Sequence, residues 1–296
     1  MQVTATMVKE LRERTGVGMM ECKKALTEAS GDLDAAIEQM RKSGQAKADK
    51  KASRIAAEGT AAIASDGKQA VIIEVNCETD FVAKDNQFQE FTNQLAELIL
   101  KSDLNSIEEL SAASLPNGQT VERTRLELVT KIGENIQVRR FEKLSASNNV
   151  ASYAHGKRIG VLVDHSGSDE VGKDIAMHIA AAKPLCLSEK EVPADVLDKE
   201  RDIAKAQAEA SGKPAEIIEK MVLGKVNKFL KESTLLGQSF IKDDSLSVEK
   251  YLKSANASVS KFIRYEVGEG LEKRSENFAD EVQKQIDDLK DKGDDD

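Results

Sequence analysis

A short motif occurs twice in this chain of 296 residues, and it limits the folds that the chain can adopt. Residues 65–74 read SDGKQAVIIE and residues 154–163 read AHGKRIGVLV, with the Gly-Lys pair at the same place in both. Each copy joins a turn to an apolar run of strand length, and Asp66-Gly67 is typical of a tight β-hairpin turn. The repeat therefore predicts two related α+β core subdomains with antiparallel sheets.

The residues that follow each motif predict similar elements in both copies. Strand-like residues 60–63 and 71–75 form the first hairpin, and helical periodicity follows it. The further elements predicted for the first copy are a helix over apolar residues from Phe88 to Ile99 with Asn86 and Gln89 as its capping box, a helix at 121–132 stopped by Gly133, and a strand at 136–144. In the second copy, a helix over Ile175, Ile179 and Ala182 and a strand at 259–267 take the corresponding places.

The segments outside the repeat are predicted to be mostly helical. Residues 4–44 show three short apolar stripes separated by glycine turns, which predicts a three-helix unit, and residues 45–58 are expected to be a partly helical linker. An insertion at 194–233 predicts two antiparallel helices. This helical hairpin either packs on the body of the chain or joins two copies as a homodimer, and the periodicity leaves both open.

The last segment carries apolar residues at helical spacing and ends in an acidic tail. Phe278, Val282, Ile286 and Leu289 predict an amphipathic helix that packs on the chain's own core or on a partner. The fold class is therefore α+β. The predicted domains are 1–54 (three helices and linker), 55–145 and 146–267 (core subdomains), and 268–296 (the carboxy-terminal helix module).

Composition excludes several classes of function. A formal net charge of −9 argues against nucleic acid as the main partner, and the basic residues between 41 and 54 suit a solvated linker or helix face. The three cysteines are widely spaced, which predicts neither disulfides nor a metal site. No leader-like segment and no run of 18 apolar residues occurs, so we expect a cytoplasmic protein without a membrane partner.

Motifs for enzymatic chemistry are missing from the sequence. It has no phosphate-binding glycine loop, nucleophile elbow or zinc-binding histidine pair, and no cofactor is expected. Cys77 near Asp80 could be an activated thiol with His155 or His178 as its base, but a buried, inert cysteine is more usual at the end of an apolar run. Both histidines suit a structural role by spacing alone. Elimination favours a non-enzymatic binding protein.

Phe81 follows the first hairpin, in the stretch NCETDFVAKDNQF at 76–88. If a helix runs continuously from Phe81, then Phe81 and Phe88 share a face and both belong to the core. If the helix begins near Asn86, residues 79–84 form a separate turn and Phe81 projects. Spacing alone slightly favours the core.

Several motifs of the chain resemble the bacterial translation elongation factor Ts family. TDFVAKD at 79–85 is similar to a signature of that family, and LRERTGVGMMECKKAL at 11–26 is similar to its amino-terminal signature. The resemblance continues through KIGENI at 131–136, YAHG at 153–156, HIAA at 178–181 and FIRYEVGEG at 262–270. It covers nearly the whole chain in order.

The resemblance implies a guanine nucleotide exchange factor that binds the GTPase elongation factor Tu, without binding the nucleotide itself. It implies that Asp80 and Phe81, flanked by Thr79 and Val82, intrude into the GTPase. The other contacts that it implies are Arg12, Met19, Met20 and Lys23 in the amino-terminal unit, Ile132 and Gly133 in the core, and His155. The last helix would also dock on the GTPase, and 194–233 would dimerise some members. The alternative is a helical scaffold or homodimeric adaptor.

Overall fold

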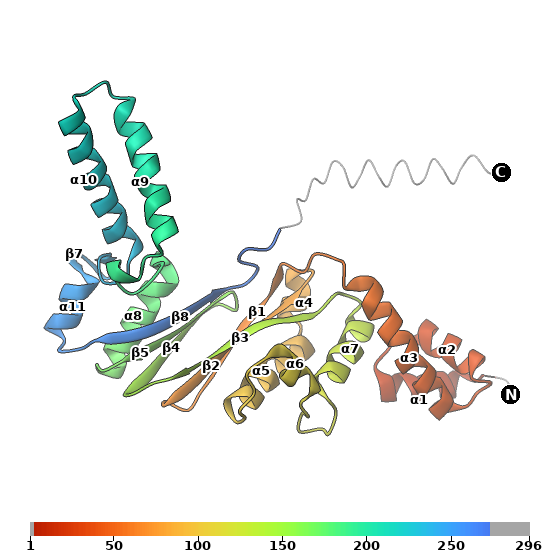
Figure 1. Ribbon diagram of the computed structural model, residues 1–296. Coiled ribbons are helices and arrows are strands. Elements are labelled where there is room, and N and C mark those ends of the chain that lie inside the picture. The colour runs from red at the N-terminus through yellow and green to blue at the C-terminus, as the bar shows by residue number, and fades with distance from the viewer. Residues whose placement is uncertain (1–2, 273–296) are drawn as a thin grey trace, which may run out of the picture.

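The computed structural model describes residues 3–272 and has an α+β fold. The molecule is elongated: a group of helices lies at the amino-terminal end, two sheets form the middle, and a long helical hairpin projects from the far end (Figure 1). The amphipathic helix predicted after Gly270 lies outside the described residues. Within residues 3–272, no helix is both long and apolar enough to cross a membrane.

The amino-terminal unit contains the three predicted helices, α1 (Ala5–Thr15), α2 (Met19–Glu28) and α3 (Leu33–Lys51). Thr4 caps α1 by accepting a hydrogen bond from Met7 N, and Gly16 ends it in the left-handed conformation. Leu11, Cys22 and Leu26 are fully buried between the helices. This small core explains how so short a unit holds together.

The predicted end of the third helix at Gly44 is wrong, because α3 continues to Lys51. The following stretch is partly helical, as predicted: residues 45–51 are helical and residues 52–57 are not. Gly44 is buried inside this helix, and a side chain there would lie 2.9 Å from Oγ1 of Thr130 on the helix α7 (Val121–Ile132). Gly44 therefore permits close packing of α3 on α7. A glycine that is predicted to end a helix can instead lie inside it, where the missing side chain lets a second helix pack closely.

The first sheet has the strand order β1-β2-β3, with all neighbours antiparallel. Its strands are β1 (Glu58–Ser65), β2 (Gln69–Cys77) and β3 (Gln137–Ser145). The helices that follow β2 are α4 (Asp80–Lys84), α5 (Asn86–Leu100), α6 (Ile107–Ala112) and α7, and they cover one face of this sheet (Figure 1). Phe88, Leu95 and Ile99 of α5 are fully buried against Val71 and Ile73.

The second sheet repeats the first, as the duplicated motif predicted. Its order is β4-β5-β8, again antiparallel. The strands are β4 (Asn149–His155), β5 (Ile159–His165) and β8 (Val259–Glu266), and helix α8 (Asp169–Ala182) follows β5. The two sheets pack on each other through apolar residues that include Ile72, Leu162 and Tyr265.

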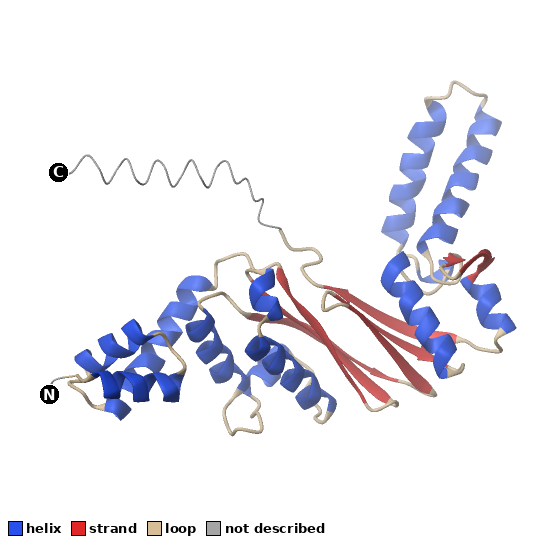
Figure 2. Ribbon diagram, turned by 180° about the vertical axis from the view of Figure 1, so that it is seen from behind, coloured by secondary structure: helices blue, strands red, loops and turns tan. Residues whose placement is uncertain are grey.

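The second copy also carries the inserted helical hairpin. Its helices α9 (Ala194–Glu209) and α10 (Ala215–Ser233) lie side by side and extend away from the sheets (Figures 1 and 2). The short elements around them are η1 (Glu189–Glu191), β6 (Ser239–Phe240), β7 (Asp243–Ser247) and α11 (Val248–Ser254). Helices α6 and α11 and the β6–β7 pair were not predicted from the sequence. The domain boundaries given above stay a prediction.

Candidate partner-binding site

Helix α4 is a separate element of five residues between β2 and α5. Thr79 begins it, and its Oγ1 accepts a hydrogen bond from Val82 N at 3.4 Å. Asp85 is extended, and its carboxylate caps α5 by accepting hydrogen bonds from Gln87 N and Phe88 N. The predicted cap at Asn86 is therefore off by one residue, and the capping box with Gln89 is wrong.

Phe81 projects from α4 into solvent with 81% of its surface exposed. No other large apolar side chain in residues 3–272 is as exposed. Its neighbours Val82 and Ala83 are buried in the core between the first sheet and its helices. One side of α4 therefore faces this core and the other side faces solvent. The prediction that Phe81 belongs to the core is wrong. Asp85 separates α4 from α5, so the spacing of seven residues no longer places Phe81 and Phe88 on one face of a single helix.

Glu134 holds the start of α4 in place. Its Oε1 accepts a hydrogen bond from Thr79 Oγ1 at 2.6 Å, and its Oε2 accepts from the backbone N–H groups of Thr79 at 3.0 Å and Glu78 at 3.1 Å. Glu134 follows Gly133, which ends α7 with a φ of 91° that favours glycine. The structure thus brings the end of α7, with Ile132 and Gly133, to the base of the Phe81 helix.

Polar contacts also fix the rest of α4. Gln89 Nε2 donates a hydrogen bond to the carbonyl of Ala83 and another to Thr60 Oγ1 at 2.6 Å. On the outer side Lys84 Nζ lies 2.6 Å from Asp80 Oδ2, and this hydrogen bond holds the pKa of Asp80 below its ordinary value. Phe81 is therefore an exposed ring on a well-anchored helix.

His155 lies at the same end of the core as α4. It is exposed at the end of β4, directly before the turn to β5, and its Nδ1 is 3.1 Å from the hydroxyl of Tyr153. In this turn the carbonyl of Lys157 accepts a hydrogen bond from Ala61 N, and Arg158 forms an ion pair with Glu58. Glu58 is opposite Cys77, at the end of β2 that leads into α4.

Comparison with known proteins agrees with this architecture. A family model described as Elongation factor TS matches residues 78–269, which include α4, strand β3 of the first sheet, the whole second sheet and the helical hairpin. The chain belongs to the elongation factor Ts family. It is 60% identical over 290 residues to an elongation factor Ts of Methylococcus capsulatus, covering 97% of this chain and 99% of that protein.

Two further elongation factor Ts proteins are nearly as similar. That of Thioalkalivibrio sulfidiphilus is 58% identical, covering 96% of this chain and 99% of that protein. That of Acinetobacter baylyi is 54% identical, covering 95% of this chain and 96% of that protein. Membership of the elongation factor Ts family makes the chain a translation elongation factor, and the family resemblance of the sequence is confirmed.

The amino-terminal residues of the elongation factor Ts signature form a second exposed patch. Arg12 lies on α1, while Met19, Met20 and Lys23 lie on α2, and all four are exposed. Met20 is 77% exposed, which is unusual for an apolar side chain. This patch lies on the three-helix unit, and its side chains belong to a different element from Phe81.

The amino-terminal unit is nevertheless joined to the core close to the site. Gly16, between α1 and α2, lies against the side chain of Lys131, so closely that a Cβ atom there would be 2.6 Å from Lys131 Cε. Lys131 directly precedes Ile132 and Gly133. The end of α7 therefore lies between the two exposed patches.

Cys77 does not have the properties of a reactive thiol. It is fully buried, and burial raises its pKa to about 12. His178 is also buried: its Nδ1 accepts a hydrogen bond from Ile241 N, and its Nε2 donates one to Gln238 Oε1. Both ring nitrogens are occupied in the second half of the core, so the structural interpretation of His178 is supported.

Sequence reasoning missed the residues that hold the site together. Glu134 and Gln89 each join α4 to another element, yet Glu134 was quoted only as part of KIGENI, and Gln89 only as half of a capping box. Glu134 carries a usable signal, because a carboxylate directly after a helix-ending glycine is well placed to accept free backbone N–H groups. In residues 3–272, no group of three or more His, Cys, Asp or Glu side chains is arranged to hold a metal ion.

Proposed function

We propose that this chain is a guanine nucleotide exchange factor that binds elongation factor Tu and promotes release of GDP. The observation that carries the proposal is the exposed Phe81 on an anchored helix, in a member of the elongation factor Ts family. A rigid aromatic side chain loses little conformational freedom on binding, so it is well suited to anchor a partner. The chain itself hydrolyses nothing and contacts no nucleotide.

Exchange follows from differential binding. If the chain binds the nucleotide-free GTPase more tightly than the GDP form, it weakens GDP by the same factor by which GDP weakens it. GTP then rebinds and displaces the exchange factor. No covalent step is needed, and no catalytic group is assigned to any residue of the chain.

Within this proposal Asp80 and Phe81, flanked by Thr79 and Val82, enter an apolar pocket of the GTPase and disturb its magnesium and phosphate site. Val82 faces the core, so its part is to seat the helix, while Thr79 fixes the helix start through Glu134. The further contacts are made by Arg12, Met19, Met20 and Lys23 on the amino-terminal patch, by Ile132 and Gly133 at the end of α7, and by His155 at the end of β4.

The decisive experiment follows release of a fluorescent GDP from elongation factor Tu. The wild-type chain should accelerate release, and no acceleration would end the proposal. Phe81→Ala should slow the accelerated release at least about 30-fold, because truncating a buried aromatic anchor commonly costs about 2 kcal/mol or more. Its thermal unfolding should stay at the wild-type temperature, since Phe81 is exposed.

A matched control is available in the helical hairpin. Leu223 is a large apolar side chain that is 61% exposed on α10, and Leu223→Ala removes a similar kind of surface away from α4. We expect this variant to exchange at the wild-type rate. If Leu223→Ala and Phe81→Ala slow exchange equally, surface hydrophobicity rather than the Phe81 site is responsible.

The second candidate function is a scaffold or homodimeric adaptor. It is favoured by the hairpin, which projects from the body and exposes Ile203, Ile217 and Leu223. Sedimentation of the wild type and of a variant lacking residues 194–233 would test it. This candidate would replace the first if the deletion abolished partner binding while Phe81→Ala exchanged normally.

A further inference from the structure

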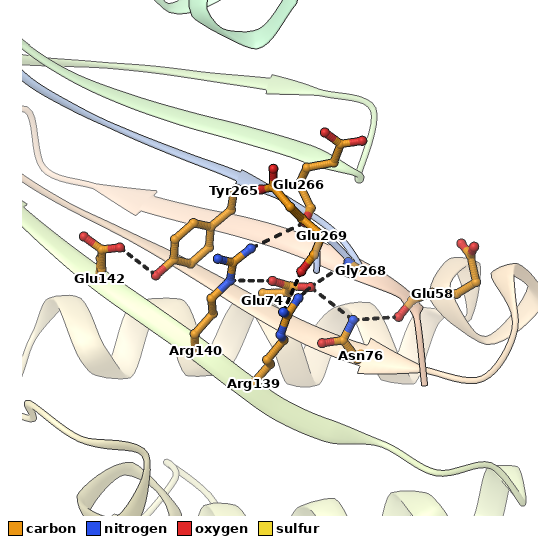
Figure 3. Close-up of polar contacts among 10 residues, drawn as sticks. All are labelled: Glu58, Glu74, Asn76, Arg139, Arg140, Glu142, Tyr265, Glu266, Gly268 and Glu269. Atoms are coloured by element: carbon orange, nitrogen blue, oxygen red, sulfur yellow. Dashed lines mark hydrogen bonds and ion pairs between the residues drawn. The ribbon is translucent and has the colours of Figure 1, made fainter. Parts of the chain in front are cut away.

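A buried carboxylate lies where the first sheet meets the end of the second. Glu74 of β2 has no exposed surface, and both of its oxygens are occupied (Figure 3). Oε1 accepts hydrogen bonds from Asn76 Nδ2 at 3.1 Å, Arg139 Nη1 at 3.0 Å and Gly268 N at 2.8 Å. Oε2 accepts one from Arg140 Nε at 2.7 Å. Burial raises the pKa of Glu74, but these hydrogen bonds outweigh it and lower the pKa overall.

The two arginines continue the connection to the second sheet. Arg139 Nη2 donates to the carbonyl of Glu269 at 2.6 Å. The guanidinium of Arg140 lies 4.1 Å from the ring centre of Tyr265, and its Nη2 donates to the carbonyl of Glu266 at 3.5 Å. Side chains of β2 and β3 thus bind the last residues of β8 and the turn after it.

Gly268 is required for this geometry. Its φ is 75°, and a Cβ atom there would lie 2.3 Å from the carbonyl oxygen of Ala57. Only glycine allows the backbone to approach Ala57 while its N–H reaches Glu74. The carboxylate and the glycine therefore form one interlocking contact between the two halves of the core.

The Glu74 cluster, defined as Glu74, Asn76, Arg139, Arg140 and Gly268, is connected to both the Phe81 helix and the turn after His155. On one side β2 continues from Glu74 through Asn76 to Cys77, two residues before Thr79, and Asn76 Nδ2 also donates to the carbonyl of Glu58 at 3.1 Å. On the other side Val267 N donates to the carbonyl of Arg158 at 2.8 Å, in the turn that follows His155. A continuous series of bonds joins the two sites.

We propose that Glu74 is a positioning residue that fixes Phe81 and His155 relative to each other, so that both engage elongation factor Tu at once. This inference rests on the proposed function. Two contacts on one rigid body bind far more tightly than the same contacts on bodies that move independently, because the second contact forms at a high effective concentration. The Glu74 cluster supplies that rigidity.

The chemistry of the contact explains why charge is used here. The facing surfaces of the two sheets are otherwise apolar, with Ala61, Ile72 and Ile263 among them. Apolar contacts are non-directional and tolerate small rotations of one sheet on the other. A buried, fully paired carboxylate accepts only one arrangement of its donors, so it fixes orientation more than it adds stability.

The test measures the dissociation constant for nucleotide-free elongation factor Tu with the full chain. Glu74→Gln should weaken binding roughly 10-fold or more, because loosening the two halves lowers the effective concentration of the second contact. In a His155→Ala background the contact made by the second half is lost and those of the first half and the amino-terminal unit remain, so Glu74→Gln should then change binding by less than about twofold. This loss of additivity is the signature of a positioning role.

Two further variants keep the test conclusive. Asp174→Asn removes another buried acid, which pairs with Lys242 on the second half, and it should bind and exchange as wild type. If Glu74→Gln does not fold, Arg139→Met replaces it, because Arg139 is partly exposed and touches both Glu74 and Glu269.

Three results would overturn the inference: equal weakening by Glu74→Gln in both backgrounds, wild-type binding by Glu74→Gln, or wild-type binding by His155→Ala. Failure of the wild-type chain to release GDP would instead remove the proposed function itself. The two failures are therefore distinguishable.

Discussion

The two halves of the core, each built on one three-stranded sheet, share the same order of strands and helices. They differ in the segment that joins the second strand to the following helix. In both, a β-hairpin is followed by a helix and a third antiparallel strand. In the second half the chain passes from β5 to α8 through Ser166, Gly167 and Ser168 alone, with Ser168 as the helix cap. In the first half the same junction contains α4 and the exposed Phe81.

This difference separates the segments that build the core from the segments that expose apolar side chains. The repeated elements fill the core, with Ile73 and Phe88 in the first half and Val163 and Ile175 in the second. The added segments, α4 in one half and the helical hairpin in the other, place apolar side chains in solvent. Exposed apolar surface thus comes from segments inserted between the repeated elements.

The largest effect is expected at Phe88, seven residues after Phe81 and fully buried. Phe88→Ala should lower the free energy of unfolding by about 3–5 kcal/mol, because it leaves a cavity in the core of the first half. Urea denaturation of Phe88→Ala beside Phe81→Ala measures the contrast. Similar losses in the two variants would contradict the division between fold and site.

A smaller effect is expected at Glu134, which anchors α4 to the shared plan. Glu134→Gln weakens the charged acceptor of three hydrogen bonds, and we expect about 2 kcal/mol of lost stability. GDP release should slow as well, since Phe81 is no longer held at one orientation. Arg123→Ala, which breaks an exposed pair with Glu127 on the same side of the core, is the control. Full exchange by Glu134→Gln would mean that α4 is rigid without this anchor.

A still smaller effect concerns pH and the second half. Burial lowers the pKa of His178 below its ordinary value, so the unfolded chain takes up a proton more readily than the folded one. Stability should therefore fall as the pH drops through about 6.5, where unfolded histidine titrates. Unfolding by urea between pH 8 and 5.5 measures this slope.

His178→Gln should reduce the pH slope, although the buried His165, whose pKa is also lowered by burial, contributes to what remains. Identical slopes in wild type and His178→Gln would show that other groups, rather than His178, govern the acid response.

The smallest effect on exchange is expected from the helical hairpin. Replacing residues 194–233 with a short glycine-serine link should change GDP release by less than about twofold, because separate structural units contribute nearly independently. Sedimentation of the same variant tests whether the hairpin joins two copies. A severe loss of exchange would show that the two insertions act together.

The periodicity of the sequence was sufficient to predict the elements that the two halves of the core share. The two hairpins, their helices and the third strands follow from the duplicated motif and from apolar spacing. Short elements escaped because too few residues carry a period: α6 has six residues and β6 has two. Gly44 was wrongly predicted to end the third helix, because its close contact with α7 depends on the tertiary fold.

The candidate site was only partly accessible from the sequence. Phe81 is exposed because α4 ends at Asp85 instead of continuing into α5. Packing decides whether the chain is helical or extended at Asp85. The residues that hold α4 come from distant positions: Glu134 is separated from Thr79 by the four helices α4 to α7. Likewise, the pairing of Glu74 with Gly268 joins segments 194 positions apart, beyond any local pattern.

The charged residues beside Phe81 have a consequence for solubility. An exposed aromatic ring invites non-specific association, especially where apolar neighbours extend the patch. Here the exposed residues next to it in the sequence are polar or charged, namely Asp80, Lys84, Asn86 and Gln87. These polar and charged side chains limit the exposed apolar surface to a single ring. Within residues 3–272 the ring can therefore stay uncovered without apolar neighbours that would promote association.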